Sequence, residues 1–415
     1  MSAREFDIVV FGATGFVGEL TARYLADHAP SGVRVALAGR NRAKLEAVRG
    51  RLPASAAGWP LLIADADAPS TLDELVARTQ VVCTTVGPYL RYGEPLVAAA
   101  ATAGTDYVDL TGEVPFVRWS IDKFDEVAQA SGARIVHSCG FDSEPSDLGV
   151  YYLYRAVTAA DAGSLTDTTL VVKAMRGGLS GGTIDSMRVI ADEVRDPEIR
   201  RLMVNPHSLS SGPGEVIRTE RGAERSDMTL VSASRVDPSL TGTLAPFFMA
   251  SHNTRIVRRT NALLDGAYGA DFRYAEAMAV GKNPVLSTAA AAALSAGMGA
   301  FFGAMALPPA RKILDKVLPK PGEGPDEKSR ERGYFTMQIF TKTTTGRRFR
   351  AQVSATGDPG YKATAMMLGE SALTLALERD KLPSRTGVLT PAAAMGDPLI
   401  ERLQEAGMVF DSVEL

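Results

Sequence analysis

The stretch FDIVVFGATGFVG, residues 6–18, decides the fold of this chain. It opens on β-branched and apolar residues that predict a buried strand, and a helical pattern begins at residue 15 and runs to residue 28. Between them, Gly12 allows a tight turn, Gly15 allows the backbone to approach a pyrophosphate, and Gly18 allows the helix to pack on the sheet. We therefore predict a dinucleotide site with the phosphates at the helix N-terminus. A purely structural turn is the alternative.

The choice of cofactor depends on the residues directly after the second predicted strand, 33–38. An NAD site usually places an acidic residue there, for the ribose 2′-hydroxyl. This chain has no Asp or Glu from residue 28 to residue 45, and it has Arg40, Asn41 and Arg42 instead. Because a guanidinium binds a 2′-phosphate well, the predicted cofactor is NADPH. The alternative is that the two arginines are solvated and say nothing about the cofactor.

Bulk composition is that of a globular protein. The chain has 415 residues, a net charge of −3, 45% hydrophobic and 22% charged residues, which predicts two domains and no nucleic-acid partner. Cys83 and Cys139 are its cysteines, and four histidines lack metal-ligand spacing, so we expect neither a disulfide framework nor a metal site. The N-terminus has no signal-peptide pattern. We expect a cytoplasmic protein, with peripheral association with the plasma membrane left open.

Strand and helix patterns alternate through the first third of the chain. We predict an N-terminal Rossmann-like, doubly wound parallel sheet over residues 1–150, with strands near 6–11, 33–38, 60–64, 80–86, 106–110 and 134–138. A second α+β domain, residues 151–360, is predicted to serve substrate binding or dimerisation on a mostly antiparallel sheet. Its strands are expected near 168–176, 228–234, 334–341 and 347–355, with a hairpin turn at 343–346. Residues 361–415 are predicted to return as helices to the first domain.

Polar residues come after the predicted ends of three strands, where a parallel sheet binds its ligand. Tyr89, after Gly87, is the candidate proton donor, and packing as a half-buried aromatic residue is its alternative. Asp142 could bind the nicotinamide ribose or amide, or close a turn. The other candidates, each with a structural alternative, are Glu113 (substrate contact or helix cap), Ser143 (nicotinamide contact or turn), His137 (core histidine) and Ser180 with Thr183 (acyl entrance or tight loop).

A segment without any charged residue lies at 284–310, and it is rich in Ala and Gly. Its length is close to that of a membrane span, but alanine is nearly neutral for insertion. A buried or interface helix, a helix on a membrane surface and a true span all remain open. Gly299 and Gly303 would permit close helix contact in each case, so a homodimer is open too.

Eight motifs, spread in order over nearly the whole chain, resemble the saccharopine dehydrogenase-like oxidoreductases and most of all the actinobacterial trans-acting enoyl reductases. They are GATGFVG (12–18), AGR (38–40), TVGPY (85–89), DLTGE (109–113), GFDSEPSDLG (140–149), GGLSGGT (177–183), GDPGY (357–361) and LTPAAAMGD (389–397). The resemblance implies an NADPH-dependent reduction of a carbon–carbon double bond in complex lipid biosynthesis. The acyl chain would be held on a polyketide synthase or an acyl carrier protein.

Two alternatives to this function remain at the level of the sequence. One is an imine or amino-acid reductase like other members of the family, and the other is a non-catalytic NADP- and lipid-associated binding protein. A basic docking patch for an acidic carrier is conceivable at Arg255, Arg258 and Arg259 and at Arg347, Arg348 and Arg350, with ordinary solvated charge as the alternative. The predicted cofactor-binding set is Gly12, Thr14, Gly15, Phe16, Gly18, Arg40, Asn41, Gly87 and Asp142.

Overall fold

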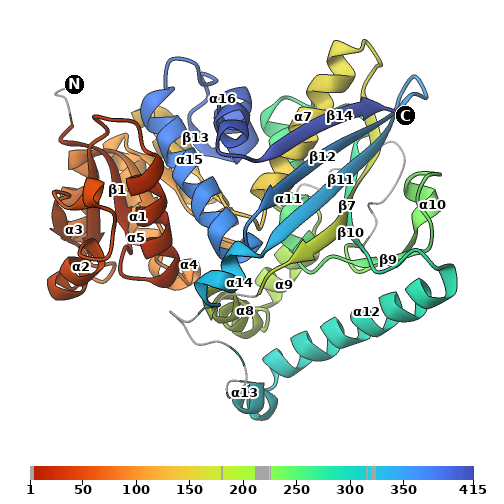
Figure 1. Ribbon diagram of the computed structural model, residues 1–415, viewed down its shortest axis with the longest axis horizontal. Helices are drawn as coiled ribbons and strands as arrows, with labels where there is room; N and C mark the ends of the chain where they lie inside the picture. Colours follow the sequence, from red (N-terminus) through yellow and green to blue (C-terminus); the bar gives the residue numbers. More distant parts are fainter. Residues whose placement is uncertain are drawn as a thin grey trace.

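A computed structural model describes residues 4–178, 181–210, 224, 226–314, 316, 318 and 324–415. Two seven-stranded sheets with helices around them form the body of the molecule, and one long helix lies along its lower edge (Figure 1). The glycine-rich stretch belongs to the first sheet, whose strands are drawn in red and orange except for β13, which is blue.

The first sheet is parallel throughout, as predicted. Its strands, in spatial order, are β13 (Gly387–Leu389), β6 (Arg134–Val136), β5 (Asp106–Val108), β4 (Thr79–Thr84), β1 (Phe6–Phe11), β2 (Val35–Gly39) and β3 (Leu61–Ile63). Six of these match the predicted strands. The seventh, β13, comes from the C-terminal region and was not predicted.

Helices cover both faces of this sheet. Successive side chains of β1 point to opposite faces and are apolar on both, so each face needs a covering layer. Ile8 and Val10 pack with one apolar core and Val9 and Phe11 with another. The first core includes α1 (Phe16–His28), α2 (Arg42–Arg49) and α15 (Thr364–Leu377); the second includes α3 (Pro69–Arg78), α5 (Glu94–Ala103) and α6 (Val114–Ser131). Helix α15 is buried on almost every side. It lies between the two sheets (Figure 1).

The second sheet is antiparallel except between β7 and β10, which confirms a mostly antiparallel sheet. Its spatial order is β14 (Val409–Glu414), β12 (Arg348–Thr356), β11 (Tyr334–Thr343), β7 (Leu165–Arg176), β10 (Arg273–Ala279), β9 (Thr243–Pro246) and β8 (Val231–Ser232). The hairpin between β11 and β12 is where it was predicted. The strand predicted at 228–234 is wrong in length, because only two residues pair with β9 at the sheet edge before a short helix begins.

The remaining helices connect the sheets or lie beside them. They are α4 (Tyr89–Tyr92), α7 (Glu144–Ala159), α8 (Gly181–Glu193), α9 (Pro197–Val204), α10 (Ala233–Val236), α11 (Ala250–Leu263), α12 (Pro284–Ala306), α13 (Pro308–Leu314), α14 (Glu327–Glu331) and α16 (Pro391–Glu405), with single turns at Ala54–Ala56 and Pro359–Ala363. The C-terminal region thus supplies one strand to each sheet, β13 and β14. The domain boundaries themselves stay a prediction.

The charge-free segment forms α12, which is long and apolar enough to cross a membrane by length and composition. Only 17% of its most hydrophobic window is buried within the molecule. A helix buried in this chain's own core, one of the alternatives left open by the sequence, is therefore wrong.

Candidate functional site

The turn between β1 and α1 has the geometry that its glycines predict. Gly12 has a φ of +88°, and a Cβ atom there would lie 2.7 Å from Val86 Cγ2. A Cβ on Gly18 would lie 2.2 Å from the Gly12 carbonyl oxygen, so the helix packs on the turn as closely as glycine allows. Gly15 is the N-cap of α1 and offers no side-chain acceptor to the first-turn N–H groups. These N–H groups are therefore available to a phosphate.

A cleft of about 240 Å³ lies on one side of this turn. Gly12, Thr14, Gly15, Gly39, Arg40, Gly87 and residues 64–67 are among those that line it. The Arg40 side chain is exposed here, at the end of β2, where a 2′-phosphate would lie. Asn41 instead caps α2 by accepting a hydrogen bond from Lys44 N–H at 3.0 Å. The glycine cradle and Arg40 fit NADPH and would lie at its pyrophosphate and its 2′-phosphate, respectively; these roles, and one for Asn41, stay predictions.

A larger cavity, of about 560 Å³, lies on the other side of the turn. Gly15, Thr85 and Gly87 line both spaces. A dinucleotide that crosses the turn would therefore have its adenosine end in the cleft and its nicotinamide end in the larger cavity. This is the crevice at the carboxyl ends of the strands in which open α/β sheets bind their ligands.

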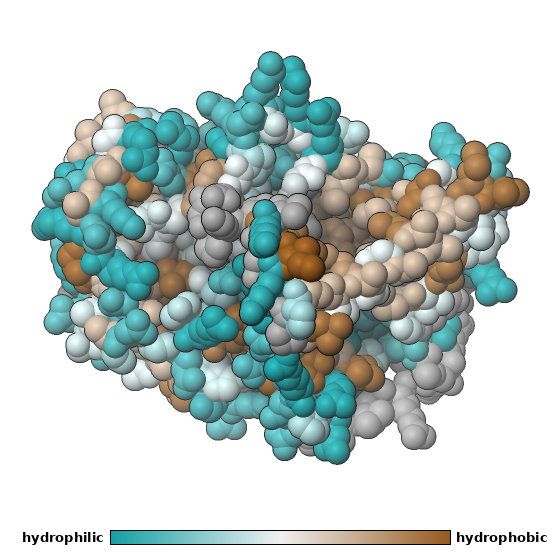
Figure 2. Space-filling model, turned by 90° about the horizontal axis from the view of Figure 1, so that it is seen from below, coloured by the Kyte–Doolittle hydropathy of each residue, from teal (hydrophilic) through white to brown (hydrophobic). Residues whose placement is uncertain are grey.

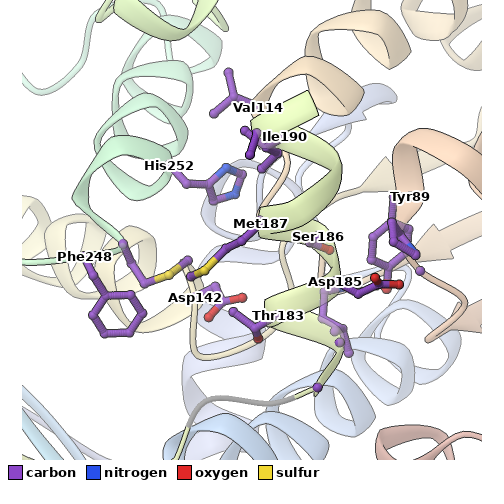
Figure 3. Close-up of a pocket in the computed structure, with 18 of the residues that line it drawn as sticks. Tyr89, Val114, Asp142, Thr183, Asp185, Ser186, Met187, Ile190, Phe248 and His252 are labelled. Atoms are coloured by element: carbon purple, nitrogen blue, oxygen red, sulfur yellow. Dashed lines mark hydrogen bonds between the residues drawn. The ribbon is translucent and has the colours of Figure 1, made fainter. Parts of the chain in front are cut away.

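The wall of the larger cavity is mostly apolar. Its apolar side chains come from both halves of the molecule, and include Phe16, Leu110, Val114, Met187, Ile190, Val194, Met203, Phe248, Met249 and Phe302 (Figure 3). Among the described residues no Lys or Arg lines it. A ligand with several carboxylates would have no cationic partner in such a space, whereas a hydrocarbon chain would bury its surface there.

Asp142 points into this cavity (Figure 3). Within the described part of the chain its carboxyl group has no hydrogen-bond or ionic partner. Burial alone raises the pKa of Asp142 from its ordinary value of 3.8 to about 6. A carboxyl group with this pKa can hold and release a proton near neutral pH. The sequence had indicated a contact with nicotinamide for Asp142, which stays a prediction.

His252, on α11, faces the same cavity (Figure 3). The Ser138 hydroxyl donates to the Thr111 carbonyl oxygen at 2.7 Å, so its oxygen is free to accept from His252 Nε2–H at 3.0 Å. The other ring nitrogen, Nδ1, is buried with no partner among the described residues. Burial, with a contribution from Arg255, lowers the pKa of His252 to about 3. The ring is therefore neutral and lines the cavity without a charge.

The N-terminus of α8 is the third polar feature of the cavity. Gly181, Gly182 and Thr183, its first three residues, line the space, and Asp185 and Ser186 lie one turn further on. A helix N-terminus stabilises negative charge that develops beside it. Thr183 had been expected at the acyl entrance and does line the cavity. Ser180 lies outside the described residues.

Tyr89 contributes its ring to the cavity wall, but its hydroxyl is already engaged. The hydroxyl donates to the Thr84 carbonyl oxygen at 3.3 Å and accepts from the Leu110 N–H at 3.4 Å. Burial raises the pKa of this phenol well above 10. The geometry matches the alternative of a packed aromatic residue, and nothing in it supports proton donation by Tyr89.

Glu113 neither faces the cavity nor caps the helix that begins directly after it. Its carboxylate accepts hydrogen bonds from the N–H groups of Tyr89 and Leu90 at 3.0 and 2.8 Å, and from the Ser186 hydroxyl at 2.6 Å. It thus caps α4, a helix earlier in the chain, and fastens α8 to the first sheet. The sequence had offered a substrate contact or a cap of the next helix for Glu113, and both are wrong. Its partner Ser186 lies 73 residues away in the chain, so nothing in the residues around Glu113 pointed to it.

Two further candidates belong to the packed interior. His137 is buried between Asp109 and Ser120, at 2.7 and 2.9 Å, so the expected core histidine is confirmed. The hydroxyl of Ser143 donates to Asn253 Oδ1 at 3.1 Å and is also buried. A contact of Ser143 with nicotinamide has no support in this geometry.

The two basic groups considered for docking are paired. Arg255 and Arg258 are buried on α11 against Asp227 and Glu224, and Arg259 donates to the backbone carbonyls of Leu209 and Val388. Arg347, Arg348 and Arg350 form ion pairs with Glu414, Asp237 and Asp411. For the first group, a docking patch and solvated charge are both wrong, because the structure uses these guanidinium groups to satisfy buried carboxylates and carbonyls.

Comparison with known proteins agrees with the geometry of the first sheet. Residues 8–136 match the family model of the saccharopine dehydrogenase NADP binding domain. A Mycobacterium tuberculosis protein named as a candidate trans-acting enoyl reductase is 53% identical over 422 residues, which cover 99% of this chain and 98% of the relative. The trans-acting enoyl reductase of Mycobacterium bovis strain BCG is 47% identical over 429 residues, or 99% of both chains.

Among solved structures, saccharopine dehydrogenase (L-Glu forming) from Saccharomyces cerevisiae superposes with a TM-score of 0.53 over 99% of this chain and 100% of its own, at 14% identity. That likeness is one of fold. The relatives, which match from end to end at about half of all positions, carry the assignment: the chain belongs to the saccharopine dehydrogenase-like oxidoreductases, in the group of the trans-acting enoyl reductases.

Proposed function

We propose that this NADP-binding oxidoreductase reduces the carbon–carbon double bond of a 2-enoyl thioester. The observation that carries the proposal is the apolar cavity of about 560 Å³, which adjoins the dinucleotide cleft and has no Lys or Arg among its described lining residues. A hydrocarbon chain would bury its surface against this wall. The relatives are named trans-acting enoyl reductases, which supports the same reaction.

The overall change adds one hydride and one proton across the double bond and leaves a saturated thioester. NADPH, when bound, supplies the hydride to the β-carbon. Negative charge then develops on the thioester oxygen, and the N-terminus of α8 at Gly181–Thr183 stabilises it. Asp142 in its protonated form gives the proton to the α-carbon.

The physiological substrate, in this proposal, is an acyl chain on a polyketide synthase or an acyl carrier protein, used for complex lipids. Support comes from the words "trans-acting" in the names of the relatives. The proposed site of action is the cytoplasm.

The two alternatives make different demands on the site. An imine or amino-acid reductase needs cationic groups for the substrate carboxylates, and the described wall offers none. A binding protein without turnover needs no proton donor, whereas the partnerless Asp142 on the cavity wall has the properties of one. Both observations favour the enoyl reductase.

The test is NADPH oxidation by the purified protein with a 2-enoyl thioester of pantetheine. We expect turnover in the wild type, and a loss of about 100-fold or more in Asp142→Asn, the usual size of general acid catalysis. NADPH binding should survive in the variant, which separates the proton from the cofactor. If NADPH binds but no enoyl thioester oxidises it, the proposed function is overturned. If Asp142→Asn is fully active, the proposed role of Asp142 is overturned.

A further inference from the structure

Helix α12 lies on the outside of the molecule although it carries no charged residue. Its 23 residues span about 35 Å, and apolar side chains are exposed on several sides of it. Figure 2 shows the helix from below as a ridge of pale to brown residues. The large exposed apolar side chains of α12 and the segment after it are Val285, Leu286, Leu294, Phe302, Leu307 and Ile313.

The helix is attached to the body of the protein near its two ends. At the start, the Ser287 hydroxyl oxygen accepts from the Thr243 N–H of β9 at 3.0 Å. At the end, the Ala306 carbonyl oxygen accepts from Arg195 at 3.3 Å, and Arg311, which donates to the Met305 carbonyl oxygen at 2.8 Å, forms an ion pair with Asp192 of α8 at 2.7 Å. Because both ends are held on the same side of the molecule, α12 cannot cross a bilayer unless the body enters it too. It can lie along a surface.

Basic residues stand at both ends of the apolar ridge. Lys282 is exposed just before α12. Burial lowers the pKa of Lys173 on β7, and the nearby charge of Lys282 lowers it further. At the other end, Lys312 and Lys316 are exposed. Cations that flank an apolar helix are attracted to anionic lipid headgroups.

The end of α12 also forms part of the larger cavity. Phe302 and Ala306 line it together with Ile190 of α8 and Val194, just beyond the end of that helix. Apolar surface therefore continues from the exposed ridge to the interior of the cavity.

We propose that α12 and α13 dock on an anionic lipid bilayer, with the helix lying in the interface and the Phe302 end of the cavity facing the lipid. The apolar side chains enter the headgroup–acyl boundary and the lysines contact the headgroups. The docking surface does not depend on the proposed enoyl reduction. It places the cavity where a long acyl chain can pass between the lipid and the protein.

A second copy of the chain fits the ridge less well than a lipid surface. Two α12 helices packed in either direction would bring lysines at their ends close to lysines of the partner, which is unfavourable. Apolar residues on several sides of α12 are also more than one partner helix can cover, whereas lipid adapts to all of them. The small residues Gly299 and Gly303 have no atom within 4 Å of a Cβ position and leave the second copy as an outcome to be tested.

The experiment is co-sedimentation of the full chain with vesicles of phosphatidylcholine alone or mixed with phosphatidylglycerol. We expect binding to the anionic vesicles and little to the neutral ones. Leu286→Glu, at a residue 70% exposed, should weaken binding by roughly ten-fold or more, because it removes one buried leucine from the lipid contact. Lys312→Ala and Lys316→Ala should each weaken it by roughly five-fold.

Val413→Glu is the matched control, since Val413 is an exposed apolar residue on β14, far from α12 (Figure 1). It should bind vesicles like the wild type, and NADPH titration shows that every variant is folded. Wild-type protein that stays in solution with both vesicle types would overturn the proposal. So would a wild-type dimer that Leu286→Glu turns into a monomer while vesicle binding is absent, a result that would make α12 a contact between copies.

Discussion

Replacing Asp142 with Asn should make the protein more stable at alkaline pH while it removes activity. Burial raises the pKa of Asp142 from 3.8 to about 6, so between these pH values the folded state binds more protons than the unfolded state. Wild-type stability therefore falls as pH rises through this window, and above it the ionised carboxylate costs about 3 kcal/mol. Asn has the same shape and no charge, so it avoids this cost.

The size of the effect can be expressed as a shift of the melting temperature. With about 2.1 cal/mol/K of unfolding entropy per residue, the 415 residues give about 0.9 kcal/mol/K, and 3 kcal/mol corresponds to about 3 °C. Calorimetric scans of wild type and Asp142→Asn should coincide at about pH 4 and differ by this amount at about pH 8. The other buried carboxyl groups are common to both proteins and cancel in the difference.

Asp73→Asn is the control, because Asp73 is an exposed carboxyl group on α3. Its melting temperature should match the wild type at both pH values. Equal stability of Asp142→Asn and wild type at about pH 8 would refute the reasoning, since it would mean that the carboxylate is solvated or paired. A gain in stability together with a loss of turnover is the pattern expected of a strained functional group.

Four further predictions test other parts of the structure. Arg40→Ala should weaken NADPH binding by about 10- to 100-fold and leave NADH binding unchanged; nucleotide titration with Arg42→Ala as the neighbouring control checks this, and an equal loss in both variants would contradict it. Gly18→Ala should destabilise the protein by about 1–3 kcal/mol and abolish nucleotide binding, because its Cβ meets the Gly12 carbonyl oxygen at 2.2 Å; Gly58→Ala, with nothing within 4 Å, should melt like the wild type. Met187→Trp fills the larger cavity and should lower kcat/KM for long enoyl chains more than for short ones, whereas a uniform decrease would place the chain elsewhere. Arg258→Ala should cost about 3 kcal/mol, because it removes the ion pair with Glu224 and leaves, among the described residues, only His207 beside that carboxylate, while Arg350→Ala should stay within about 1 kcal/mol; equal melting temperatures of the two variants would contradict this.

The sequence by itself determined the first sheet, the dinucleotide turn and the expected cofactor. The reason is that these depend on local requirements. Residues 6–18 encode a strand, a turn that only glycine can form, and the start of a helix that packs against this turn only because it carries a glycine there. The absence of acidic residues after β2 is a local signal of the same kind. The motifs that carry the family resemblance are likewise short and continuous.

Only the tertiary structure decided which polar groups reach the cavity. His252 gave no signal in the sequence, because an isolated histidine on a helix becomes part of a site only when α11 packs beside the first sheet. Tyr89 lies after a strand end as a donor would, but backbone groups of Thr84 and Leu110 occupy its hydroxyl. The first outcome depends on residues 114 positions apart, Ser138 and His252, and the second on the exact path of the backbone around Tyr89.

Which segments are buried was likewise decided by the tertiary structure. The arginines of α11 read as surface charge, yet they lie inside the protein because buried carboxylates and carbonyls are there to receive them. The charge-free residues of α12 left a buried or interface helix, a surface helix and a span open, and the structure shows that they are mostly exposed. Local sequence sets the polarity of a segment and its secondary structure, whereas its position inside or outside depends on which other surfaces remain to cover it. For α12 this chain supplies too few covering surfaces, and we therefore propose that lipid covers its remaining apolar side chains.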